Sequence, residues 1–199
     1  MEKITIYKDQ LSRMRSMNRY YHDQFLIDVR VLFVLNTIFI FLSLGSSNAL
    51  YLLPLISLFG SVILSFHAYF LIFSRQYTQF IEERINTEFD EDILIAHELE
   101  NEYFFPINQK KIVVAVLNKG FTWFSFVTLF ITFYGVSTFA WSIYQIINNE
   151  MNINFVYFIL LVTLVTLSVG FWWFLSGTGE KRLESCLLYT SPSPRDSSP

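Results

Sequence analysis

Three ionisable residues, Asp28, Arg30 and His67, stand in or beside long apolar stretches of the sequence. A carboxylate next to an imidazole can relay a proton, and an ionisable residue inside a membrane is a functional candidate because its burial is costly. If the chain folds back near residues 46 and 47, His67 lies within about one 5.4 Å helical turn of the other two in depth. The sequence therefore predicts a candidate intramembrane polar pair among these residues.

The same residues also fit a structural role at the membrane edge. With a hydrocarbon core of about 30 Å, all three lie near one boundary, where Asp28 meets headgroups and Arg30 can extend to water. Asp28 and Arg30 point about 200° apart on a helix, so they face different neighbours. Interfacial anchoring or a structural pair is favoured over a proton or ion relay.

An acidic stretch, FDEDILIAHELENEYF at residues 89–104, holds carboxylates and one histidine. Such side chains are ligands for divalent cations. The stretch lacks a Glu-x-x-His pair, the EF-hand spacing with its glycine, and any cysteine. A solvated helix face is the favoured interpretation, and we expect no metal and no cofactor.

Small and hydroxylated residues recur at steps of three and four in the apolar stretches. Such residues are typical of helix packing in membranes because they let backbones approach closely. The predicted helix-packing residues are Ser57, Ser61, Ser65, Thr128, Thr132, Gly135, Thr163 and Gly170.

Motifs of the common enzyme classes are missing from the sequence: it has no Walker loop, dinucleotide glycine fingerprint, nucleophile elbow or zinc motif. No motif of a known family was found either. The formal net charge of −3 also argues against nucleic-acid binding. These observations favour a protein that is not an enzyme, with no nucleic-acid partner.

The composition indicates a membrane protein. Of the 199 residues, 53% are hydrophobic, 19% are aromatic and only 16% are charged, against about a quarter charged in soluble domains. No Asp, Glu, Lys or Arg occurs in residues 31–74, 121–149 or 151–179. A span needs about 20 apolar residues, so the first stretch must hold two spans.

Turn residues divide these stretches into four predicted spans. Gly45-Ser46-Ser47-Asn48 separates the first two, and residues 148–152 separate the last two. The predicted spans are Phe25–Leu44, Leu50–Phe73, Phe121–Ile147 and Ile153–Leu175. We therefore expect an all-α integral membrane fold with four transmembrane helices in two hairpins and a helical cytoplasmic loop.

Lysine and arginine occur in residues 1–24, 74–120 and 176–185 and are absent from both short turns. By the positive-inside rule, both termini and the central loop face the cytoplasm of a bacterial cell, and the protein is a multi-pass protein of the cytoplasmic (inner) membrane. The predicted segments are a cytoplasmic amphipathic arm (1–24), hairpin 1 (25–73), an acidic helical cytoplasmic loop (74–120), hairpin 2 (121–175), a truncated cytoplasmic tail (176–185) and an artefact (186–199).

For two of these segments, the arm (1–24) and the central loop (74–120), the sequence is compatible with more than one structure. The arm has an apolar face that suits anionic lipid, but it could equally extend the first span or pack on the central loop. In that loop, Asp90 or Asp92 suits the N-cap of a short helix that ends before Pro106.

The tail carries the peptide CLLYTSPSPRD at residues 186–196. A back-translation of this peptide resembles a sequencing-library adaptor. We interpret it as adaptor read-through, against the alternatives of a proline-rich partner motif or a lipidated Cys186. The native part of the sequence is then expected to end near Ser185.

For function, the sequence favours a non-enzymatic membrane protein that acts by self-association or partner binding through its cytoplasmic face. The expected partners are the lipid bilayer and either further copies of the chain or another membrane protein. The alternative is a small oligomeric transporter or channel, in which several subunits together enclose a path.

Overall fold

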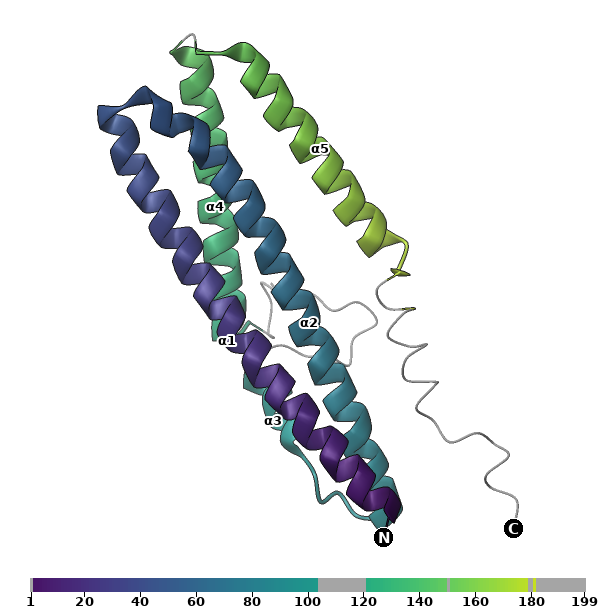
Figure 1. Ribbon diagram of the computed structural model, residues 1–199. Coiled ribbons are helices and arrows are strands. Elements are labelled where there is room, and N and C mark those ends of the chain that lie inside the picture. Colours follow the sequence, from purple (N-terminus) through teal and green to yellow (C-terminus); the bar gives the residue numbers. More distant parts are fainter. Residues whose placement is uncertain (1, 104–120, 150, 179–180, 182–199) are drawn as a thin grey trace. The chain divides into compact units, whose positions relative to one another are not determined.

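The computed structural model describes residues 2–103, 121–149, 151–178 and 181, and all regular elements in these ranges are helical (Figure 1). In chain order they are α1 (Glu2–Gly45), the short 3-10 helix η1 (Ser47–Tyr51), α2 (Leu52–Phe89), α3 (Ala96–Tyr103), α4 (Trp123–Asn148) and α5 (Ile153–Leu175). The predicted all-helical class is confirmed.

Four of the helices in the described ranges are long and apolar enough to cross a membrane. They cover Ile4–Gly45, Ser47–Phe89, Trp123–Asn148 and Ile153–Trp173, and each contains one of the predicted spans or nearly all of it. Both predicted breaks are present, since α1 ends at Gly45 and α4 ends at Asn148. The pairing of the spans into two hairpins stays a prediction.

Helix α1 is longer than any bilayer requires. It has 44 residues, which at 1.5 Å per residue is about 66 Å, or twice the ~30 Å hydrocarbon core. No glycine or proline interrupts residues 2–44, so nothing in the sequence breaks the helix where the charged part meets the apolar part. The predicted arm, residues 1–24, is therefore a direct extension of the first span.

The arm uses its apolar face to pack on α2 (Figure 1). Leu11 of α1 is buried together with Ile81 and Ile85 of α2, and Tyr7 and Met14 pack around them. Ile81 and Ile85 belong to the segment predicted as the central loop (74–120). The structure therefore shows two of the alternatives together, since the arm extends the first span and also packs on that segment.

Helix α4 packs against both α1 and α2. One buried cluster joins these three helices, and a second joins η1, α2, α4 and the first turn of α5. The first cluster consists of Phe25, Leu32, Leu64, Leu71, Phe124 and Ile131, and the second of Leu50, Leu53, Ile146 and Val156. From Tyr157 onward, α5 belongs to a separate compact unit.

The link between α2 and α3 corrects one prediction. Asp90 is the C-cap of α2, with φ 53° and ψ 30°, and its backbone N–H donates to Asn86 O. Aspartate tolerates this left-handed conformation better than most residues, which explains its place at a helix end. The prediction that Asp90 or Asp92 is the N-cap of the next helix is wrong, because α3 begins only at Ala96.

Several predictions lie outside the described residues. These are the end of the central loop (104–120), the truncated tail beyond Thr178 except for Lys181, and the adaptor-like residues 186–199.

Candidate functional site

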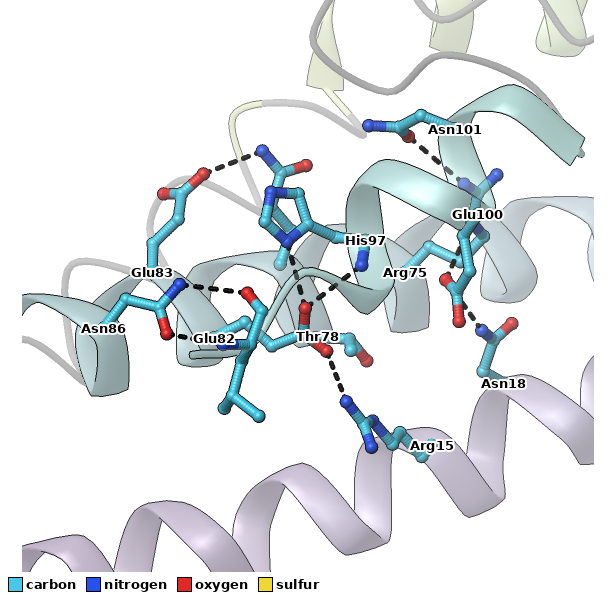
Figure 2. A network of polar contacts seen from close by, with 12 residues as sticks. Arg15, Asn18, Arg75, Thr78, Glu82, Glu83, Asn86, His97, Glu100 and Asn101 are labelled. Carbon is cyan, nitrogen blue, oxygen red and sulfur yellow. Dashed lines mark hydrogen bonds and ion pairs between the residues drawn. The ribbon is translucent and has the colours of Figure 1, made fainter. Parts of the chain in front are cut away.

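The most extensive polar network among the described residues lies at the charged end of α1 and α2, where α3 packs against α2 (Figure 2). We call these parts of α1 (residues 2–24), α2 (residues 74–89) and α3 the head. The first candidates for chemistry in the sequence lie in the apolar stretches. Packing of the arm on the central loop was one of the alternatives, but the individual residues of this network were not predicted.

Glu82 of α2 is the centre of the head. Its side chain is 0% exposed, and it contacts both other helices. Oε1 accepts a hydrogen bond from Arg15 Nη2 of α1 at 2.8 Å, while Oε2 accepts from His97 N at 3.1 Å and from His97 Nδ1 at 3.0 Å. A buried carboxylate is strongly unfavourable without such partners. Glu82 therefore links three helices through one side chain.

The bond to His97 N also explains where α3 begins. The first backbone N–H groups of a helix lack partners within the helix, and a side-chain oxygen just before it usually accepts from one of them. Here the acceptor comes from Glu82, 15 positions earlier in the chain. An acidic group is favourable at this helix end.

Arg75 makes a second connection between α2 and α3. It is 1% exposed, and it donates from Nε to Glu100 Oε2 at 3.4 Å and from Nη2 to Asn101 Oδ1 at 3.2 Å. Glu100 Oε2 also accepts from Asn18 Nδ2 of α1 at 3.5 Å. Burial lowers the pKa of Arg75 to about 10, and Glu100 opposes this shift. The guanidinium therefore keeps its charge at neutral pH.

Asn86 fixes the link between the two helices. Its Nδ2 donates to Leu94 O and its Oδ1 accepts from Leu94 N, both at 2.9 Å. The amide thus satisfies both backbone groups of one link residue, as a neighbouring strand would. Together with Glu82 and Arg75, it places the whole α2–α3 connection on one face of α2.

The spacing of these residues is a sequence signal of the site, but an ambiguous one. Arg75, Thr78, Glu82 and Asn86 recur at steps of three and four, which is one helix face, and all four are buried. From sequence alone this polar row is indistinguishable from a solvated face.

An acidic hollow of about 480 Å³ lies beside the network. Five carboxylate residues line it: Glu83, Asp90, Glu91, Asp92 and Glu98. Within the described ranges, no group of three or more histidine, cysteine, aspartate or glutamate side chains is arranged to hold a metal ion. The hollow is a negatively charged surface feature of the head.

The structure brings together two of the three ionisable candidates in the apolar stretches. His67 Nδ1 and Asp28 Oδ2 form a hydrogen-bonded pair between α2 and α1, with the two side chains 17% and 19% exposed. Arg30 is exposed, and it makes no side-chain hydrogen bond or ion pair with any described residue. The polar pair thus consists of Asp28 and His67 alone.

Some of the predicted helix-packing residues lie at contacts between helices, and others bond only within their own helix. Ser57 is buried and donates to Asn36 Oδ1 of α1 at 3.2 Å, and a methyl group added at Gly135 would lie 4.0 Å from Ser61 Oγ. Ser57 and Gly135 thus lie where helices meet. The hydroxyls of the remaining residues bond to carbonyls of their own helices: Ser61, Ser65, Thr128, Thr132 and Thr163. A methyl group at Gly170 would meet nothing within 4 Å among the described atoms.

One close helix contact was missed at Gly60. A methyl group added there would overlap Leu32 Cδ1 and would lie 3.2 Å from Leu32 Cγ. Gly60 therefore lets α1 and α2 approach each other, and it stood outside the four-residue spacing used to select the serines.

Chemically, the head network acts as a structural connection between helices. Glu82 is closed to solvent and already accepts three hydrogen bonds, so it has no access to a substrate. Comparisons of the chain with protein-family models, with curated proteins and with solved structures found no match.

Proposed function

We propose that this chain is a non-enzymatic four-span membrane protein that binds another membrane protein or a further copy of itself through the head. In the proposed topology, the spans form two hairpins in a bacterial inner membrane. The head and both termini then lie in the cytoplasm, because lysine and arginine cluster on that side.

The observation that carries this proposal is the burial of Glu82 between α1, α2 and α3. A helix of eight residues such as α3 has little stability alone. The ionic contacts of Glu82 and Arg75 hold it on α2 in one orientation. A surface that is already ordered loses less conformational entropy when a partner binds.

The surface of the head combines charge and apolar area. Beside the acidic hollow, Ile93, Ile95 and Leu99 are 53%, 47% and 54% exposed. Protein interfaces commonly have apolar contacts in the centre with a polar rim. We expect the partner to cover these three side chains.

Photo-crosslinking in native membranes tests the proposal. A photoreactive amino acid at Ile95 or Leu99 is expected to give a discrete protein adduct, whose mass separates a second copy from another protein. The matched control places the same amino acid at Phe133 in the apolar part of α4, which is 76% exposed. Lipid adducts alone at all three positions would contradict partner binding by the head.

The pair Asp28 and His67 favours a second candidate, a small oligomeric transporter or channel that moves protons. Proton flux into proteoliposomes that contain the wild-type chain, but not the His67→Phe variant, would support it. Equal flux with the two proteins would rule it out.

A further inference from the structure

A groove of about 450 Å³ is lined by residues of α1 and α2, apart from the head. Its walls are apolar and include Val31 and Leu35 of α1 and Leu52, Phe59 and Ile63 of α2. These five side chains are 38% to 58% exposed. If the helices cross a membrane, as proposed above, these side chains form an apolar groove at the depth of the hydrocarbon core, where an acyl chain can lie.

The floor of the groove depends on Gly60. This residue lines the groove together with Leu32, and the missing side chain lets Leu32 lie directly against α2. Leu32 is only 4% exposed.

Asp28 is the one charged residue among those that line the groove. It lies about 27 Å from the turn at residue 46 at 1.5 Å per residue, near the edge of a ~30 Å hydrocarbon core. His67 Nδ1 bonds to Oδ2, and Oδ1 has no hydrogen-bond partner among the residues that the structure describes. Asp28 thus lines an apolar groove with a side chain that is 19% exposed, and one of its carboxylate oxygens accepts no hydrogen bond from a described residue.

Of the common lipid headgroups, a primary ammonium suits this oxygen best. It carries N–H donors and a positive charge, so it can form a charge-assisted hydrogen bond with a carboxylate. A quaternary ammonium has no N–H donor, and an anionic headgroup is repelled by Asp28.

The length of the groove suits a single acyl chain. In an antiparallel pair turning near residues 46 and 47, Leu52 is level with residue 41, which is 13 residues from Asp28. At 1.5 Å per residue this is about 20 Å, somewhat more than half of the ~30 Å core.

We propose that the groove between α1 and α2 binds a phospholipid with a primary amine headgroup, whose ammonium group contacts Asp28 and whose acyl chain lies along Leu35, Phe59 and Ile63. The lipid belongs to the leaflet on the same side as the head. The inference rests on the proposed membrane placement and is independent of partner binding by the head.

Native mass spectrometry of the full chain tests the inference. The detergent-purified protein is incubated with phosphatidylethanolamine, phosphatidylcholine or phosphatidylglycerol of identical acyl chains, and the retained lipid is counted. Loss of one charge-assisted hydrogen bond corresponds to about a tenfold difference in affinity. We expect the wild type to retain phosphatidylethanolamine with about tenfold higher affinity than the other two lipids, and we expect Asp28→Asn to lose this preference.

Two further variants control the measurement. Asp23→Asn removes an exposed aspartate of the same helix and should leave the preference unchanged. Val31→Phe fills the groove and leaves Asp28 in place, so it should lower the retention of all three lipids. This second variant tests the groove independently of any effect that Asp28→Asn has on folding. Equal retention of the three lipids by the wild type, or retention unaffected by both Asp28→Asn and Val31→Phe, would overturn the proposal.

Discussion

Replacing Glu82 by alanine removes the side chain that contacts both Arg15 and His97. Two donors of His97, its backbone N–H and its Nδ1, lose their acceptor, and Arg15 loses its ionic partner. We expect α3 to detach from α2 locally while the apolar parts of α1, α2 and α4 stay packed.

The magnitude follows from the burial of each group. Each donor of His97 left without an acceptor costs about 1–3 kcal/mol. Arg15 is 44% exposed, so it can turn to water and its contribution is small, about 0–1 kcal/mol. Together these costs amount to about 2–7 kcal/mol, a range that includes the cost of about 3–5 kcal/mol for breaking a buried ion pair.

Hydrogen exchange of the full chain in lipid nanodiscs measures the free energy with which α3 docks on α2. A loss of 3 kcal/mol in docking free energy increases exchange of the α3 amides by about a hundredfold. Glu82→Gln keeps an oxygen for His97 and turns its amide nitrogen toward Arg15. Its effect should therefore be smaller, on the order of tenfold.

Glu83→Ala is the matched control. Glu83 is the next residue of the same helix, is exposed, and accepts from Gln79 Nε2 in the same helix. Exchange of α3 should change by no more than about twofold in this variant. Two results would refute the role assigned to Glu82. One is that the α3 amides exchange as slowly in Glu82→Ala as in the wild type, and the other is that their exchange increases equally in Glu82→Ala and Glu83→Ala.

Two further predictions concern the apolar helices and are checked by unfolding in detergent. Gly60→Ala is expected to lower the free energy of unfolding by about 1–3 kcal/mol, because the new methyl group overlaps Leu32; Gly170→Ala is the control, and equal effects would contradict the explanation. Asn36→Leu should leave stability unchanged or raise it by about 1 kcal/mol, because Asn36 Nδ2 is buried with no partner among the described residues. The hydroxyl of Ser57 can then bond to its own helix, and a clear loss of stability in Asn36→Leu would show that the amide has a favourable role.

The sequence predicted the helices of this fold well because hydropathy and turn residues are local signals. Three stretches without charged residues, the first of them divided by turn residues, predicted four long helices. Gly45 and Asn148 mark helix ends that the turn residues indicated. The positions and ends of the helices can be predicted without knowing which helices pack against each other.

The buried contacts of the head could not be predicted, because they join residues that lie far apart in the sequence. Glu82 and Arg75 are charged residues in a charged segment, and only the position of α1 and α3 makes them buried. Asp90 illustrates the same limit: aspartate is preferred as an N-cap, but it also tolerates the left-handed backbone conformation that ends α2, and sequence alone could not choose between the two positions. The cap of α3 comes from Glu82 on another helix, where no local rule would look for it.

The continuity of α1 has a mechanical consequence. No glycine or proline interrupts residues 2–44. If α1 crosses a bilayer, as proposed above, it therefore has no such hinge at the membrane surface and behaves as a rigid lever. Spans tilt when bilayer thickness changes, and a 10° tilt moves the tip of a ~30 Å extension by about 5 Å. Because Arg15 and Glu82 connect the extensions of α1 and α2, both would swing together, and α3 would travel with them. The head would then report the thickness or tension of the bilayer as a displacement.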